Sequence, residues 1–175
     1  ETMADRFEIM CDLAEKYGLK LPQRALELLQ QETPKELTNV ATQINGSVKE
    51  LCAAAAKCCE ALGYAPVMLT DQLDCQAREA GAFLAAVAKT HAGNGKKQAF
   101  IAGGETVVKL TGHGKGGRNQ ELALSAAAGI AGIPGAAVFS VGSDGTDGPT
   151  DAAGGYVDHE THGELKAMGI DLHRV

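Results

Sequence analysis

Apolar residues recur at helical spacing along several stretches of the chain. Near the start, Phe7, Met10 and Leu13 fall on one face of a helix. Gly18 follows where a helix C-cap is expected. The same spacing, read along the whole sequence, predicts helices at about residues 3–17, 22–31, 51–62, 76–91, 118–130 and 160–168.

Short apolar runs lie between these helices. They are too short for helices and are bounded by glycine, proline or polar turn residues, which is typical of strands. Strands are expected at residues 38–44, 66–70, 98–102, 106–111 and 136–141. Because helices and strands alternate with short connections, the sequence predicts an α/β fold, with a layered, mostly parallel sheet and helices on both faces.

Two of the expected strands are very close in sequence. Only the segment from Gly103 to Glu105 separates the run 98–102 from the run 106–111. A crossover between parallel strands needs roughly a dozen residues or more. We therefore expect an antiparallel hairpin near residues 98–111.

The composition is that of an ordinary globular domain. The 175 residues are 45% hydrophobic with a net charge of −6, which excludes a disordered tail and a disulfide-rich miniprotein. The acidic balance argues against nucleic acid, and no run approaches the ~20 apolar residues of a membrane span. Five cysteines without framework spacing indicate a reducing compartment, so we expect a cytoplasmic protein.

Glycines gather in a loop just before one of the expected helices. Residues 112–117 lie between a strand and the helix that begins at Arg118. Glycine backbone and a helix N-terminus both attract anions, and Lys115 and Arg118 add full positive charges. The sequence therefore predicts an anion site built from Gly114, Lys115, Gly116, Gly117, Arg118, Asn119 and Gln120.

The same loop contains the pattern G-x-G-x-x-G, at Gly112, Gly114 and Gly117. In a dinucleotide-binding enzyme this pattern follows a buried parallel strand, and an acidic residue stands about 20 residues further on. Position 137 is Ala, and the preceding run alternates apolar and polar residues. The match to a dinucleotide-binding loop is therefore weak.

A second polar cluster follows the strand expected at 136–141. Asp144, Asp147 and Asp151 lie within eight residues, with Thr146 and Thr150 between them. Carboxylates at the end of a strand hold Mg²⁺ or accept a proton from a substrate hydroxyl. We expect a function for this turn, with a hydrogen-bonded turn as the simpler structural explanation.

Three motifs together resemble the C-terminal domain, called MOFRL, of the type-2 glycerate kinase family, which has also been labelled hydroxypyruvate reductase. They are Gly-Gly-Glu-Thr at 103–106, Gly-Lys-Gly-Gly-Arg-Asn-Gln-Glu at 114–121 and Gly-Thr-Asp-Gly-Pro-Thr-Asp-Ala-Ala-Gly at 145–154. The likeness continues upstream through residues 61–64 and 77–81, and so covers most of the chain.

The resemblance implies ATP-dependent phosphorylation of D-glycerate, with Mg²⁺, in a cleft between two α/β domains. It assigns residues 1–37 to the tail of an N-terminal domain and a linker, 38–96 to an α/β connecting region, and 97–175 to the MOFRL-like domain. Family members are more than twice as long, so the resemblance implies a fragment, truncated at both ends and inactive alone. The expected partner is glycerate, and a homodimer is left open.

For the site, the resemblance makes Arg118 the first candidate to grip a phosphoryl group or the substrate carboxylate, with Lys115 second. Gly103, Gly104 and Glu105 join the substrate-binding set with Asn119, Gln120, Thr146 and Thr150. Asp144, Asp147 and Asp151 are candidates for the Mg²⁺ shell, and Asp147 also for the catalytic base. Two alternatives stand beside the kinase: an NAD(P)H-dependent hydroxypyruvate reductase and a non-catalytic α/β ligand-binding module.

Overall fold

A computed structural model describes residues 3–31, 38–41, 43 and 46–172 of the chain. The chain divides into two compact units, residues 1–44 and residues 45–175. In the first unit, α1 (Met3–Lys16) is followed by α2 (Gln23–Leu29). Gly18 has a φ of +62° and ends the first helix, as the sequence predicts. No helix in the described ranges is long and apolar enough to cross a membrane.

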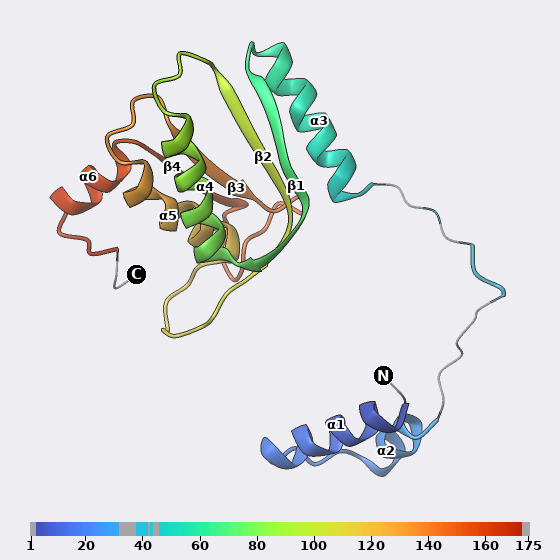
Figure 1. Ribbon diagram of the computed structural model, residues 1–175. Coiled ribbons are helices and arrows are strands. Elements are labelled where there is room, and N and C mark those ends of the chain that lie inside the picture. Colours follow the sequence, from blue (N-terminus) through green and yellow to red (C-terminus); the bar gives the residue numbers. More distant parts are fainter. Residues whose placement is uncertain (1–2, 32–37, 42, 44–45, 173–175) are drawn as a thin grey trace. The chain divides into compact units, whose positions relative to one another are not determined.

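The second unit contains most of the secondary structure (Figure 1). Its elements, in chain order, are α3 (Val48–Ala61), β1 (Ala65–Gln76), α4 (Ala77–His91), β2 (Gln98–Val107), α5 (Arg118–Ile130), β3 (Ala137–Val141), β4 (Gly154–Asp158) and α6 (Thr161–Ala167). Each helix expected at or after residue 51 is present, with ends shifted by a few residues.

The strands form two separate pairs. β1 and β2 are parallel and are joined through α4, while β3 and β4 are antiparallel. α3 packs on one side of the parallel pair, and α4 and α5 lie on the other side (Figure 1). α5 also packs against β3 and β4. The predicted α/β class with helices on both faces is therefore confirmed.

The antiparallel hairpin lies in a different place from the predicted one. Residues 98–107 form one continuous strand, β2, which runs parallel to β1, and residues 108–111 lie outside it. The prediction of a hairpin at 98–111 was therefore wrong. The hairpin is β3–β4 instead, and its second strand, Gly154–Asp158, was not expected from the sequence.

Close packing explains why Gly103 and Gly104 do not form a turn. A Cβ at Gly103 would overlap the Cys52 sulfur on α3, and one at Gly104 would overlap the backbone of Leu73 on β1. The two glycines therefore let β2 run tightly between a helix and its partner strand. The strand expected at 38–44 does not form in the described residues 38–41 and 43, and residues 42 and 44 lie outside the described ranges.

The core of the second unit is built from small side chains on α4 and α5. Gly81 and Gly129 bring these two helices close together, because a Cβ on Gly81 would overlap the Leu122 carbonyl and the Ser125 hydroxyl. A Cβ on Gly129 would stand 2.5 Å from the Ala85 methyl group. Around this contact, the buried cluster comprises Ala77, Ala80, Ala85, Leu122, Ala123, Ala126, Ala127, Ile130, Val138 and Val157.

The contact at Gly81 makes a stability prediction. Gly→Ala in a helix interior ordinarily stabilises by about 1 kcal/mol. At Gly81 the added methyl group forces α4 away from α5, so we expect Gly81→Ala to destabilise the protein by roughly 1–3 kcal/mol. Gly163→Ala in α6 is the matched control, since a Cβ there meets open space. Urea unfolding measures both variants, and equal stabilities would contradict the packing argument.

Candidate functional site

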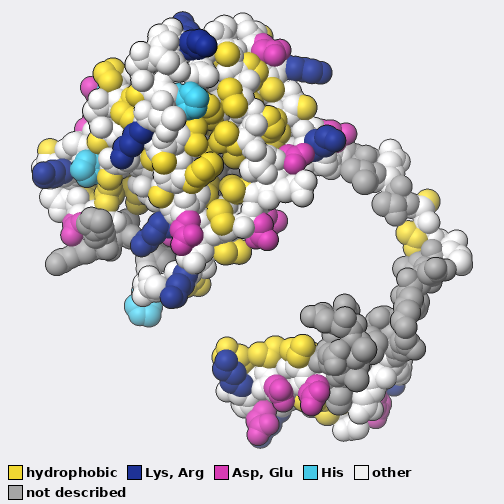
Figure 2. All heavy atoms as spheres, in the orientation of Figure 1, with side chains coloured by type: hydrophobic (Ala, Val, Ile, Leu, Met, Phe, Trp, Pro, Cys, Tyr) yellow, Lys and Arg dark blue, Asp and Glu magenta, His cyan; other side chains and the backbone are white. Residues whose placement is uncertain are grey.

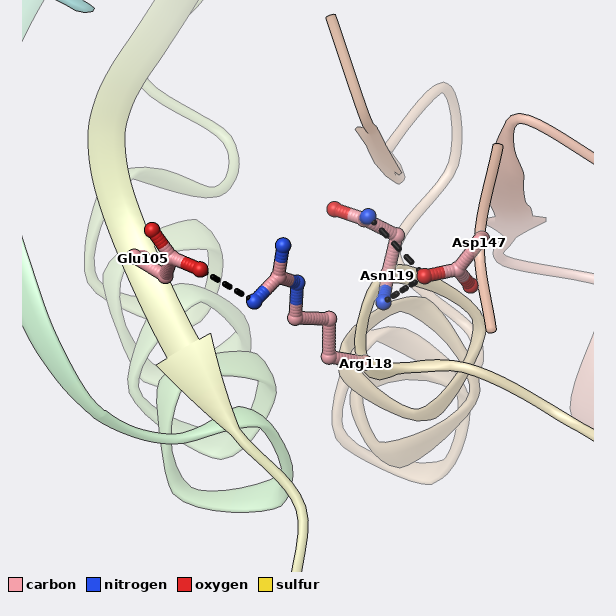
Figure 3. A network of polar contacts seen from close by, with 4 residues as sticks. All are labelled: Glu105, Arg118, Asn119 and Asp147. Carbon is pink, nitrogen blue, oxygen red and sulfur yellow. Dashed lines mark hydrogen bonds and ion pairs between the residues drawn. The ribbon is translucent and has the colours of Figure 1, made fainter. Parts of the chain in front are cut away.

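The start of α5 is capped by a carboxylate from a distant loop. Asp147 Oδ1 accepts hydrogen bonds from the backbone N–H of Asn119 (3.0 Å) and from its side-chain amide (3.0 Å). Asp147 Oδ2 accepts from the backbone N–H of Gln120 (2.8 Å) and from its side-chain amide (3.1 Å). Figure 3 shows Asp147 meeting Asn119 at the first turn of the helix. Both oxygens therefore face donors from α5.

Asp147 is almost fully buried, with 2% of its surface exposed. Burial alone would raise the pKa of its carboxyl group, but the hydrogen bonds from Asn119 and Gln120 outweigh burial and hold the pKa below its ordinary value.

Two glycines leave the space that the Asp147 carboxylate and its turn need. A Cβ on Gly117 would overlap the Asp147 carboxylate, and one on Gly148, whose φ is +61°, would overlap the Gly116 carbonyl.

This contact changes the interpretation of the predicted anion site. The N–H groups of Asn119 and Gln120 were expected to face a ligand anion, but they donate to Asp147 instead. The carboxylate thus occupies the place at the helix N-terminus that a phosphate would take. These two N–H groups are therefore not free for a ligand anion, and Lys115 and Arg118 are the cations that stand nearest to this end of α5 in the sequence.

The capping contact extends into a network that ties three segments together. The Gln120 side-chain amide donates to Thr150 Oγ1 (3.0 Å), and that hydroxyl donates to the Asp147 carbonyl (2.7 Å). Ser140 Oγ, on β3, donates to Asn119 Oδ1 (2.6 Å). The sequence indicated Asn119, Gln120 and Thr150 as site residues but not Ser140, which stands in an ordinary apolar strand. The acidic turn is therefore fixed against both α5 and β3.

The three aspartates proposed for Mg²⁺ are not gathered into one cluster of ligands in the described part of the chain. Within the described ranges, no group of three or more His, Cys, Asp and Glu residues is arranged to hold an ion. Asp147 already accepts four hydrogen bonds, and the exposed Asp144 accepts one from the Thr146 backbone N–H (3.1 Å). Asp151 is also exposed. The aspartates therefore do not fit the predicted magnesium shell.

A second contact joins the end of β2 to the start of α5. Arg118 Nη1 donates to Glu105 Oε1 at 2.5 Å, with 45% of the Arg118 side chain and 75% of the Glu105 side chain exposed. In Figure 3 one terminal nitrogen of Arg118 faces Glu105, and the other points away from it. Arg118 thus keeps donors available beside the loop that precedes α5.

The remaining predicted residues lie around this pair. Lys115, Gly114 and Gly116 are exposed in the loop between β2 and α5, and Thr146 is exposed in the acidic turn. Gly103 and Gly104 lie within β2, directly before Glu105. The structure therefore brings the motifs at 103–106, 114–121 and 145–154 to one end of α5.

Charged side chains are scattered over the visible face of the second unit, while hydrophobic side chains gather across it (Figure 2). Exposed apolar residues on the β3–β4 pair include Phe139 and Tyr156, which lie opposite each other in the register. The cations on this face do not form a continuous basic track.

Comparisons with known proteins agree on one family. Residues 98–175 match the MOFRL family. The chain is 48% identical to a D-glycerate 2-kinase of Thermotoga maritima, over 90% of this chain and 39% of the relative. A protein of Agrobacterium vitis described as a putative hydroxypyruvate reductase is 34% identical, over 97% of this chain and 40% of the relative.

A solved structure agrees with these sequence matches. The crystal structure of a glycerate kinase from Thermotoga maritima superposes with a TM-score of 0.77 at 46% identity, and covers 96% of this chain and 42% of the other. The match therefore spans about two-fifths of the length of each of these relatives.

Removing the charge of Asp147 should weaken the fold. In Asp147→Asn, an amide N–H₂ group replaces one oxygen and faces donors from Asn119 or Gln120, so at least one buried donor loses its acceptor. We expect a loss of about 3 kcal/mol in the free energy of unfolding, measured with urea. Asp151→Asn, an exposed substitution in the same turn, should change that free energy by less than about 0.5 kcal/mol.

The lowered pKa of Asp147 also predicts a pH dependence. A depressed carboxyl pKa stabilises the folded state fully above the unfolded-state pKa of about 3.9, and this stabilisation is lost as the pH falls from there through the folded-state pKa. The difference in unfolding free energy between wild type and Asp147→Asn should therefore be constant from pH 7 to 5 and shrink below pH 4. A difference that stays constant down to pH 2.5 would contradict the assignment.

Proposed function

Because this chain belongs to the type-2 glycerate kinase family, with a MOFRL domain at residues 98–175, we propose that it is part of an enzyme that transfers the γ-phosphate of ATP to a hydroxyl group of D-glycerate. The name of the Thermotoga maritima relative favours the 2-hydroxyl group. The segments that the longer relatives have in addition are proposed to supply the rest of an interdomain cleft, so that this chain alone does not turn over.

The observation that carries this proposal is the position of Arg118. Its guanidinium group stands exposed at the first residue of α5, with one nitrogen held by Glu105. Phosphoryl transfer depends on positioning and on neutralising negative charge rather than on covalent help from the protein. We propose that Arg118 binds the transferring phosphoryl group or the glycerate carboxylate, and that Lys115 assists from the loop.

The roles proposed for the neighbouring polar residues follow from their contacts. Asn119 and Gln120 hold the start of α5 in place, because their amide groups are engaged with Asp147, Ser140 and Thr150. Asp147 is a poor general base, since its pKa is lowered and both of its oxygens accept hydrogen bonds. These contacts at the start of α5 would hold the backbone of the neighbouring Arg118 in place.

ATP is the proposed phosphoryl donor, and glycerate the proposed small-molecule partner. Within the described residues, Asp144, Asp147 and Asp151 are not gathered as a shell for the Mg²⁺ that commonly accompanies ATP. A cytoplasmic location is proposed as well. The free thiols of Cys11, Cys52, Cys58, Cys59 and Cys75 are compatible with a reducing compartment.

The reductase alternative has support from the description of the Agrobacterium vitis relative. The local structure favours the kinase instead. β2 ends at Val107, well before the glycine pattern at 112–117, and Asp147 takes the N-terminus of α5 where a dinucleotide pyrophosphate would bind. The loop therefore lacks the tight strand-to-helix turn of a dinucleotide site.

The proposal is tested in a chimera in which this chain replaces the aligned segment of the Thermotoga maritima relative. ATP consumption with D-glycerate is measured beside NADH and NADPH oxidation with hydroxypyruvate. We expect kinase turnover, and a loss of at least about 100-fold in kcat/KM in Arg118→Ala, because a charge-stabilising contact is removed.

Arg78→Ala is the matched control, since it removes another ion pair of an exposed arginine, the one between Arg78 and the half-buried Glu121 (3.4 Å). It should leave turnover close to that of the unmodified chimera. Nicotinamide oxidation without ATP consumption would favour the reductase, and a wild-type rate in Arg118→Ala would remove that residue from the mechanism. Absence of both activities, with no binding of ATP or glycerate, would favour a non-catalytic module.

A further inference from the structure

The ion pair between Glu105 and Arg118 joins two residues whose backbone is held by other contacts. Glu105 lies on β2, opposite Asp74 in the parallel pairing with β1. Arg118 is the first residue of α5, whose next two residues are held by Asp147. The ten-residue segment between Val107 and Arg118 is not needed to bring the two side chains together. The geometry of the pair is thus set by a strand and a helix.

Stability does not explain this pair. Both side chains are substantially exposed, and exposed ion pairs contribute little to the free energy of folding. The Glu105 carboxylate also stands beside the cation proposed to bind an anion, so its charge weakens anion binding there. The contact therefore adds little to the stability of the fold and, by itself, weakens the binding of an anion. This suggests that Glu105 has another role.

We propose that Glu105 is a positioning residue that orients the Arg118 guanidinium group for an anionic ligand. This inference rests on the proposed function, since the ligand is the phosphoryl group or carboxylate described above. Glu105 contacts only Nη1, so Nε and Nη2 remain on the opposite edge of the group. That edge presents two parallel N–H donors, the arrangement that binds carboxylate or phosphate oxygens in a bidentate manner. Glu105 thereby selects one rotamer of a long side chain.

Kinetics in the chimera separate positioning from direct binding. Glu105→Ala leaves Arg118 in several rotamers, so we expect kcat to fall on the order of 10-fold. KM for D-glycerate should stay unchanged or fall, because a repelling charge is removed. Glu105→Gln keeps an oxygen that accepts from Nη1, and should recover most of the lost kcat. A rise in KM in both variants, at constant kcat, would instead assign Glu105 to direct substrate binding and overturn the proposal.

A double-mutant cycle tests whether Glu105 acts through Arg118. In an Arg118→Lys background the ammonium group lacks the paired donors that Nε and Nη2 of arginine present on one edge. Glu105→Ala should then have little further effect on kcat. If Glu105→Ala lowers kcat by the same factor in both backgrounds, then Glu105 acts independently of Arg118, and the proposal fails.

A measurement without turnover distinguishes this proposal from the proposed function. In the 175-residue chain, the ¹⁵N order parameter of Arg118 Nε–H reports how well the guanidinium group is held. It should fall in Glu105→Ala and be retained in Glu105→Gln. Glu27→Ala, which removes the exposed pair between Arg24 and Glu27 (3.6 Å), is the control and should leave it unchanged.

An unchanged order parameter in Glu105→Ala would overturn the positioning role even if the chimera is an active kinase. If the chimera is inactive but the order parameter falls as expected, the orienting contact stands, and the proposed function is what fails.

Discussion

One buried carboxylate organises this end of the molecule. Asp147 places its charge at the positive end of α5 and accepts four hydrogen bonds there, so burial of the charge is compensated. The surrounding sequence is adapted to it. Gly117 leaves space for the carboxylate, Gly148 leaves space for the Gly116 carbonyl, and Ser140 holds the far side of the Asn119 amide. The start of α5 and the acidic turn are therefore a single structural unit.

Local patterns in the sequence predicted what depends on local physics. The periodicity of apolar residues located α5, and the glycine run located its start at Arg118. The pair Gly103–Gly104 was misinterpreted because its cause lies far away in the chain, at Cys52 and Leu73. A sequence pattern cannot distinguish a glycine needed for a turn from a glycine needed for close packing.

In the candidate site, too, the sequence predicted the features that depend on single residues and missed those that depend on distant contacts. Arg118 and the glycine loop were recognisable because charge and backbone freedom are properties of the residues themselves. The role of Asp147 was not, since its partners Asn119 and Gln120 lie 28 and 27 positions earlier. From the sequence it was one of three similar aspartates. Only the fold identifies it as the cap of a helix, and so separates it from the exposed Asp144 and Asp151.

The loop between β2 and α5 has anchors that do not depend on it. Its first end is held by the pairing of β2 with β1, and its second by Asp147. The entropy of closing a loop changes only slowly with its length. Insertions within residues 109–113 should therefore cost the fold little free energy, so the length of this segment can change the space in front of Arg118 while β2 and α5 stay where they are.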